Sequence, residues 1–463
     1  MNPDSVPRLL GRATEVLEAE FARLPDYEPD AECAEEAMSR VLDDVAHRLG
    51  DNFPYFHPLY AGQMLKPPHP VARAAYALAM KINPNNHARD GGRASSEMEI
   101  EAVAGIAAMF GWKSGEFLGH LTSSGTMANL EALWVAGQLS PGKRILGSEQ
   151  AHYTHSRISS VLKLDFKQVA TDNRGRMSLE ALEEELRQGS VGTVVVTLGT
   201  TAIGAVDPLV EILALRERYG FRIHVDAAYG GYFGLIADDL DDPARQAYLN
   251  ISRADSIVID PHKHGLQPYG CGCALFRDPA VGRFYKHDSP YTYFTSSQLH
   301  LGEISLECSR AGAAAVALWA TQRLLPLERG GAFAEGLSKG RRAALELDRR
   351  LREDPRFEGL AAGGPELDIV VWKMRAGAPE AASELAQNTF VACSTRDLHL
   401  ALVQLPLRWF DPSAMPQRSI GRGEGNGEMV RCLRSVLMKP EHERWLDEIW
   451  QRLVAASSET AEA

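Results

Sequence analysis

The chain has 463 residues, of which 45% are hydrophobic and 24% are charged, and its formal net charge is −12. This length predicts two or three packed units, and the ordinary composition excludes a disordered or fibrous protein. The negative charge disfavours a broad binding surface for nucleic acid or anionic lipid, so we expect a small-molecule partner.

Six cysteines are spread along the chain without the density or spacing of a disulfide framework, which favours a reducing compartment. Cys271 and Cys273 could suggest a metal pair, but the apolar run around them is typical of a strand, so we expect structural cysteines. The N-terminal segment lacks a basic start followed by an apolar core, and no stretch approaches about 20 uninterrupted apolar residues. We therefore expect a cytoplasmic protein that does not contact membranes.

Three segments follow one another along the chain. Residues 1–60 carry helical periodicity and predict an N-terminal helical arm. Residues 61–325 alternate helical patterns with short apolar strands, which predicts an α/β large domain with a mostly parallel sheet covered by helices on both faces. Residues 326–463 begin with a long helical pattern and continue with further strands and a closing helix, which predicts a small α+β domain.

Hydroxyl and glycine residues at 122–126 come directly before a helical run. The free N–H groups and the dipole of a helix start favour an anion, so Ser123, Ser124 and Gly125 are candidates for binding a phosphate. Ordinary helix capping explains the same residues equally well.

Two predicted strands of the large domain end in residues that can carry chemistry. Asp226 lies at a strand end, where ligands of such sheets bind, and a carboxylate there can keep a ring nitrogen protonated. Lys263 follows a later strand, and a lysine whose pKa is lowered can form a Schiff base with an aldehyde cofactor. The alternatives are a turn aspartate and a surface lysine. His262 and His264, which flank Lys263, give only weak support for a metal site.

Taken together, these segments resemble the group II amino-acid decarboxylases that depend on pyridoxal 5'-phosphate (PLP). The resemblance covers about residues 55–440 and implies the aspartate-aminotransferase fold (fold type I), with a seven-stranded sheet in the large domain. It also implies decarboxylation of an L-amino acid and a homodimer with its active sites at the interface. The strings that carry the resemblance are HPLYAGQM (57–64), RASSEMEIEAV (93–103), TSSGTMANLEAL (122–133), AHYTHSR (151–157), LGTTAIGAVDP (198–208), HVDAAYGG (224–231), DPHKHG (260–265) and ECSRAGAAAVALW (307–319).

The resemblance assigns roles to individual residues. Lys263 is expected to form the Schiff base with PLP, Asp226 to pair with the pyridine nitrogen, and His152 to stack on the cofactor ring. Tyr291, with Tyr293 as its competitor, matches a loop tyrosine that protonates the substrate carbon after CO2 leaves. Further cofactor contacts are expected from Ser123, Ser124, Gly125, Thr201, Ala228 and His262.

The substrate is less well defined by the sequence. Arg310 resembles an arginine that meets the substrate carboxylate, for which a bidentate guanidinium is suited, and an ordinary ion pair is its alternative. Arg93, Tyr60 and His264, together with Phe56, are candidates to line the side-chain pocket. Arg93 and His264 depart from the residues that relatives with aromatic substrates often carry. We therefore expect an acidic or an aromatic amino acid.

Other functions remain open at this point. A PLP-dependent carbon–carbon lyase, or an oxidative decarboxylase that makes an aldehyde, would use the same fold. A catalytically idle scaffold that keeps the fold for assembly is a further alternative, and the presence of Lys263, Asp226 and His152 argues against it. A metal hydrolase using His152 and His155 is disfavoured because no H-E-x-x-H or comparable motif is present.

Overall fold

A computed structural model describes residues 5–27, 34–87, 90–286, 304–410 and 428–462. Its α-helices are α1 (Ser5–Glu20), α2 (Glu35–Leu49), α3 (Pro70–Met80), α4 (Arg93–Met109), α5 (Gly125–Leu139), α6 (Thr154–Val161), α7 (Leu179–Arg187), α8 (Leu209–Tyr219), α9 (Ala244–Leu249), α10 (Gly312–Leu324), α11 (Ala332–Glu353), α12 (Pro379–Ser394) and α13 (His442–Glu462). Its strands are β1 (Leu118–Thr122), β2 (Arg144–Ser148), β3 (Phe166–Val169), β4 (Val191–Thr197), β5 (Arg222–Asp226), β6 (Ser256–Ile259), β7 (Gly272–Phe276), β8 (Phe357–Gly359), β9 (Ile369–Met374), β10 (Ala401–Pro406) and β11 (Met429–Val436).

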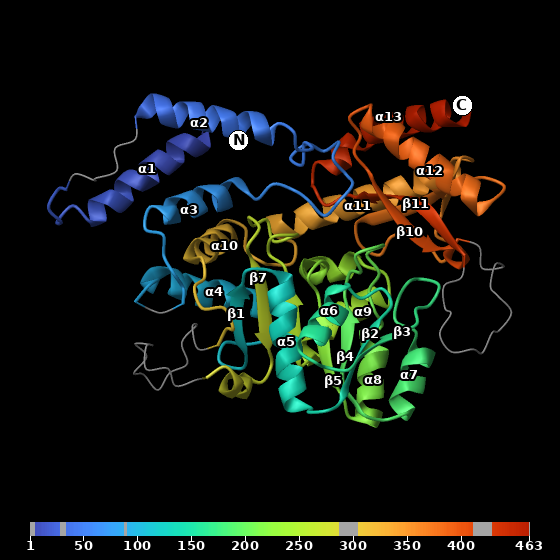
Figure 1. Cartoon of the computed structure of the whole chain (residues 1–463), viewed down its shortest axis with the longest axis horizontal. Helices are drawn as coiled ribbons and strands as arrows, with labels where there is room; N and C mark the ends of the chain where they lie inside the picture. Colours follow the sequence, from blue (N-terminus) through green and yellow to red (C-terminus); the bar gives the residue numbers. More distant parts are fainter. Residues whose placement is uncertain (1–4, 28–33, 88–89, 287–303, 411–427, 463) are drawn as a thin grey trace.

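The larger sheet has seven strands in the order β1-β7-β6-β5-β4-β2-β3. Strands β3, β2, β4, β5 and β6 are parallel to one another, and β7 is antiparallel to both of its neighbours. Helices α5, α7 and α8 lie against this sheet in the lower part of Figure 1. The predicted fold class, with its mostly parallel seven-stranded sheet, is confirmed.

Burial explains why the central strands are so apolar. All seven residues of β4, VGTVVVT, are buried, as expected for a parallel strand covered on both faces by helices. Helix α8 then ends at Gly220, whose φ of 70° lies in the left-handed region that glycine tolerates best. Parallel strands joined through helices bring their carboxyl ends to one edge of the sheet, and this edge carries the candidate site.

A second sheet has four antiparallel strands in the order β10-β11-β9-β8. Its core includes the fully buried Phe357 and Trp372, and helices α12 and α13 lie beside it in Figure 1. This sheet matches the α+β character predicted for the C-terminal region. The division of the chain at 60/61 and 325/326 stays a prediction.

The first two helices differ from the rest of the molecule in their lack of burial. Neither α1 nor α2 has a buried residue, and both lie at the upper left of Figure 1, outside the body that contains the two sheets. Glu18 of α1 forms an ion pair of 2.8 Å with Lys81, the residue directly after α3. The predicted helical arm therefore consists of two helices that the rest of the described chain covers poorly.

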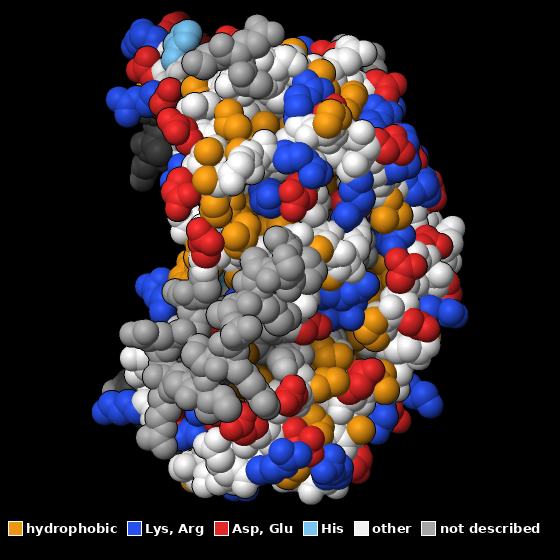
Figure 2. Space-filling model, turned by 90° about the vertical axis from the view of Figure 1, so that its right-hand side faces the viewer, with side chains coloured by type: hydrophobic (Ala, Val, Ile, Leu, Met, Phe, Trp, Pro, Cys, Tyr) orange, Lys and Arg blue, Asp and Glu red, His pale blue; other side chains and the backbone are white. Residues whose placement is uncertain are grey.

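The surface in Figure 2 interleaves acidic and basic side chains with scattered hydrophobic ones. No continuous area of one charge sign stands out among the described residues on this face. Within the described ranges, no helix is long and apolar enough to cross a membrane.

Candidate active site

A cavity of about 200 Å3 lies at the carboxyl edge of the seven-stranded sheet. The ends of β4 and β5, the start of α5 and the segment after β6 all contribute to its wall. It brings together eight residues that were predicted from the sequence to bind the cofactor: Ser124, Gly125, His152, Thr201, Asp226, Ala228, His262 and Lys263. Residues as far apart as Ser124 and Lys263 therefore meet in one place.

Asp226 is the last residue of β5, and its side chain is 4% exposed. Its Oδ1 accepts a hydrogen bond from the backbone N–H of Ala228 at 3.1 Å, and its Oδ2 lies 2.8 Å from Nε2 of His155. Burial by itself raises the pKa of Asp226, but the hydrogen bond from His155 and the charge of Lys263 hold the pKa well below its usual range. Asp226 therefore stays negatively charged inside the protein.

From the sequence, His155 was named only as a possible ligand in a disfavoured metal hydrolase. It lies in α6, its side chain is fully buried, and its ring donates to Asp226. Its Nδ1 has no hydrogen-bond partner among the described residues. His155 lies in the string AHYTHSR that carries the family resemblance, three residues after His152, which precedes α6.

Lys263 lies in the loop after β6, with its Nζ 3.0 Å from Oδ2 of Asp260. Burial acts to lower the pKa of Lys263, but the charges of Asp260 and Asp226 outweigh it and raise the pKa above its ordinary value. This direction is opposite to the lowered pKa that the sequence argument assumed for a nucleophilic lysine. The reason is the second carboxylate, Asp260, whose role the sequence did not reveal.

The start of α5 forms another wall of the cavity. Ser124 caps the helix by accepting the N–H of Met127 at 3.2 Å. A Cβ built on Gly125 would lie 2.4 Å from Oδ1 of Asp260, so the close approach of helix and carboxylate requires glycine. The helix start thus presents free N–H groups to the cavity, an arrangement suited to a phosphate.

Two histidines complete the cavity wall. His152 accepts hydrogen bonds at Nδ1 from the amide and the hydroxyl of Thr154, and burial lowers the pKa of His152, which favours a neutral ring. His262 donates from Nδ1 to the carbonyl of Cys271 at 2.7 Å. Both rings are therefore fixed by local hydrogen bonds.

Two predicted site residues lie beside the cavity without lining it. Ser123 is exposed, and its N–H donates to Glu307 at 2.9 Å. Arg310 is engaged by Glu99 at 2.8 Å and by the carbonyl oxygen of Leu121 at 2.6 Å. This pairing matches the ion-pair alternative for Arg310, and its contact with a substrate carboxylate stays a prediction.

The other predicted substrate residues do not line the cavity either. Arg93 is the exposed first residue of α4, and Tyr60 is buried beside Tyr55. His264 points to Asp368 and lines a different cavity, to which Phe56 also contributes. Their roles in substrate binding stay predictions. Tyr291 and Tyr293 lie outside the described residues.

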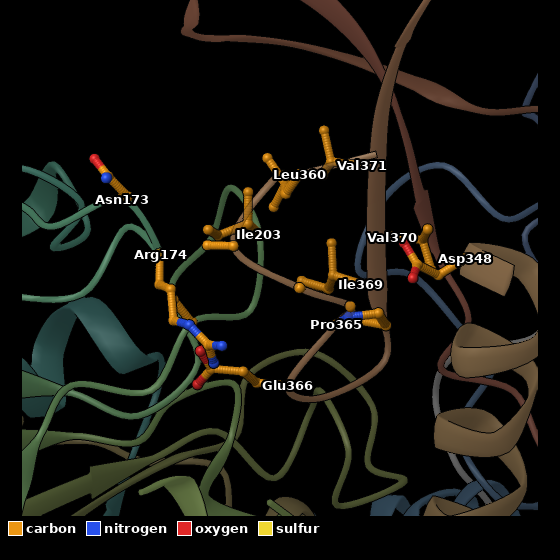
Figure 3. Close-up of a pocket in the computed structure, with 14 residues that line it drawn as sticks. Asn173, Arg174, Ile203, Asp348, Leu360, Pro365, Glu366, Ile369, Val370 and Val371 are labelled. Carbon is orange, nitrogen blue, oxygen red and sulfur yellow. The ribbon is translucent and has the colours of Figure 1, made fainter. Parts of the chain in front are cut away.

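A further cavity, drawn in Figure 3, lies between the loops around Arg174 and Ile203 and strand β9. Figure 3 shows Arg174 pointing toward Glu366. Its space of about 30 Å3 suits about one water molecule, and it contains none of the predicted site residues. The described residues also contain no group of three or more His, Cys, Asp or Glu side chains placed to hold a metal ion.

The cavity at the sheet edge has the features that PLP requires. The cofactor needs an amine for its aldehyde, an anion beside its ring nitrogen and donors for its phosphate. Lys263, Asp226 and the start of α5 offer these three groups within one wall. The oxygens Oδ1 of Asp260 and Oγ1 of Thr197, on two lining residues, are buried without hydrogen-bond partners in the described chain. The residues present therefore fit this cofactor.

Comparison with curated proteins finds decarboxylases. The chain is 28% identical over 425 residues to an L-tyrosine decarboxylase of Enterococcus faecium, covering 70% of this chain and 68% of the relative. It is 28% identical over 323 residues to a probable L-tyrosine/L-aspartate decarboxylase of Methanothermobacter thermautotrophicus, covering 69% and 84%. An aspartate 1-decarboxylase of Aliivibrio fischeri is 33% identical over 229 residues, covering 42% and 41%.

Solved structures and a family profile complete the comparison. The fold matches the crystal structure of Oryza sativa TDC with PLP and tryptamine, with a TM-score of 0.78, 18% identity and 99% coverage of both chains. It also matches mouse CSAD, with a TM-score of 0.75, 21% identity and coverage of 96% and 92%. The profile described as "Pyridoxal-dependent decarboxylase conserved domain" matches residues 24–375. The chain therefore belongs to the pyridoxal-dependent decarboxylase family.

Proposed function

We propose that this PLP-dependent decarboxylase acts on an L-amino acid with an acidic or aromatic side chain, releasing CO2 and the corresponding amine, with its cofactor bound to Lys263. The observation that carries the proposal is the single cavity in which Lys263, Asp226 and His152 meet. The three residues come from segments far apart in the sequence, so their convergence is a property of the fold.

Each of these side chains has a distinct task in the proposal. When bound, PLP supplies an electron sink for the bond that breaks at the substrate α-carbon. Asp226, held ionised by His155, keeps a proton on the pyridine nitrogen because a nearby negative charge favours the cationic form. The neutral ring of His152 would contact the cofactor ring, and the start of α5 would bind the phosphate of the cofactor.

Lys263 is the proposed attachment point of the cofactor, and Asp260 positions its amine. Its amine would hold the cofactor covalently, and the free amine lies 3.0 Å from Asp260. Asp260 stabilises the ammonium form of this lysine and would keep it inside the site whenever it is not bound to the cofactor. Tyr291 is our candidate for returning the proton to the substrate carbon.

The substrate class rests on the relatives, because the predicted side-chain residues lie outside the cofactor cavity. Relatives of this chain are named for tyrosine, for aspartate and for both. Only the aspartate side chain is charged at neutral pH, but the side chains of tyrosine and aspartate are both larger than a methyl group and end in oxygen. We therefore propose a pocket with hydrogen-bond donors or cations at its far end.

We propose a homodimer whose interface includes the first two helices. Helix α2 exposes a stripe of large apolar side chains with helical spacing, which are Met38, Val41, Leu42, Val45 and Leu49, each between 46% and 62% exposed. Such a contiguous apolar stripe is costly in water and marks an interaction surface. A second copy of the chain is the partner that the family resemblance implies.

Replacing Lys263 by alanine should abolish turnover and the adduct trapped by borohydride. The reason is that this amine is the proposed attachment point of the cofactor. Mass spectrometry of the reduced, digested protein measures the adduct. Lys143→Ala, at an exposed lysine, is the matched control and should keep it. Persistence of the adduct in Lys263→Ala would place the attachment on another lysine.

Replacing His155 by leucine should weaken PLP binding about tenfold or more, since a hydrogen bond to a charged group contributes about 1.5–3 kcal/mol. The pKa of Asp226 should rise when this donor is lost, so Asp226 should become protonated at a higher pH than in the wild type. Because Asp226 is the proposed partner of the pyridine nitrogen, the absorbance of bound PLP should change with pH in that higher range. Equilibrium dialysis and a spectral pH titration measure the two effects. His155→Gln keeps a donor and should restore much of the affinity. A leucine variant with wild-type affinity and spectrum would remove His155 from this role.

A panel of L-amino acids, assayed for CO2 release and for products, tests the reaction. We expect tyrosine or aspartate, or close analogues, to give CO2 and amine in equal amounts. Aldehyde with hydrogen peroxide would instead support the oxidative alternative, and cleavage without CO2 would support a carbon–carbon lyase. No turnover of any amino acid by PLP-loaded protein would favour an idle scaffold.

The double variant Val41→Asp with Val45→Asp should dissociate the dimer, because it places two charges on the apolar stripe of α2. Light scattering should then give about half the wild-type mass. Asp43→Asn, on the opposite side of the same helix, should leave the mass unchanged. A wild-type mass of one chain, or a double variant that remains dimeric, would contradict the proposed interface.

A further inference from the structure

A second cavity, of about 270 Å3, is lined in part by His264, the residue after Lys263. We call it the lysine cavity, and its wall includes Lys66, His264 and Lys439. It shares no lining residue with the cofactor cavity. Although Lys263 and His264 are adjacent in sequence, the first reaches Asp260 and the second lies 3.3 Å from Asp368. The segment from His262 to Leu266 therefore contributes to the walls of two cavities.

The two lysines of this cavity form no salt bridge with a described carboxylate, although Glu441 lines the same cavity and acts on both of them. Nζ of Lys66 donates to the carbonyl of Met438 at 3.2 Å, and Nζ of Lys439 donates to the carbonyl of Tyr60 at 2.5 Å. In the described part of the chain, no carboxylate oxygen lies within 4.0 Å of Nζ of Lys66 or of Lys439, the distance at which a salt bridge would form. Each ammonium group has three N–H donors, so donors remain for another acceptor.

Burial makes this arrangement costly. Lys439 is only 3% exposed, and burial together with the charge of Lys66 lowers its pKa to about 7. Burial also lowers the pKa of Lys66 to about 8, although the carboxylates of Asp368 and Glu441 oppose the shift. An anion between the two lysines would offset this cost, because buried charges are tolerated when they are paired.

His264 adds a second, independent sign of a missing partner. Its side chain is buried, and neither ring nitrogen has a hydrogen-bond partner in the described chain. Its Nε2 lies 3.3 Å from Oδ2 of Asp368, whose other oxygen, Oδ1, accepts the hydroxyl of Tyr229 at 2.5 Å. Buried polar atoms are normally satisfied, so unsatisfied ones at a cavity wall point to a ligand.

The remaining wall of the lysine cavity is mainly apolar, and it also carries His69 and Glu441. It is formed largely by proline, leucine and phenylalanine side chains, among them Pro68, Leu266, Leu325, Phe333 and Leu337. Sites for small molecules combine such apolar walls with a few converging polar groups. We propose that the lysine cavity binds a small organic anion, a carboxylate with a short apolar body, whose charged end meets Lys66 and Lys439.

Calorimetric titration of the PLP-loaded enzyme with hexanoate tests this proposal, and 1-hexanol is the uncharged control ligand. We expect hexanoate to bind with one site per chain and hexanol to bind at least tenfold more weakly, since only the anion engages the lysines. Binding at pH 8 should take up protons, because the anion favours the ammonium forms. Repeating the titration in two buffers of different ionisation heat measures this uptake in the wild type, without any variant.

Variants locate the site. Lys66→Met and Lys439→Met should each weaken hexanoate binding at least tenfold, and Lys143→Met at an exposed position should not. Lys263→Ala should keep the binding, because Lys263 does not line this cavity. The proposal is overturned if hexanoate does not bind, if hexanol binds equally well without proton uptake, or if Lys263→Ala removes the binding. The assay needs no turnover, so its result is independent of the proposed reaction.

Discussion

The contact between Asp226 and His155 is the interaction on which the rest of the site depends. A carboxylate that is 4% exposed would normally take up a proton to avoid burying a charge. Here the imidazole of His155, 2.8 Å away, and the N–H of Ala228 stabilise the ionised form. The fixed negative charge at the end of β5 is what makes an electron-poor cofactor ring possible in the proposed chemistry.

The fold explains why such a contact can form. Parallel strands deliver their last residues to one edge of the sheet, and the helices between them start at the same edge. Asp226 comes from β5, Lys263 from the segment after β6, and the phosphate-binding candidates from the start of α5. The two carboxylates Asp226 and Asp260 compensate the positive charge of Lys263, and Gly125 leaves room for Asp260 at the helix start. Electrostatics and backbone geometry are thus satisfied together.

Much of this could be predicted from the sequence, because apolar strand patterns and strand-end polar residues are local signals. The alternation of helices and short apolar strands predicted for residues 61–325 is observed, with strands β1 to β7 lying in this range. Strand β3, FKQV, gives a weak local signal because it exposes two of its four residues, and β1 carries the buried His120, whose polarity is offset by Glu131 at 2.7 Å. The latter pairing is a tertiary contact that no local pattern reveals.

The same limit applies to the site. Lys263, Asp226 and His152 follow from motifs, whereas the partnership of His155 with Asp226 and of Asp260 with Lys263 depends on how strands are ordered in space. For Arg310, the motif predicted a contact with the substrate carboxylate. In the described chain its guanidinium donates to Glu99 and to the carbonyl oxygen of Leu121.

A crystal structure of the protein with PLP tests the central claim most directly. We predict continuous density between Nζ of Lys263 and the cofactor, with a carboxylate oxygen of Asp226 within hydrogen-bond distance of the pyridine nitrogen. Density that joins the cofactor to a different residue, or a ring nitrogen turned away from Asp226, would contradict the account.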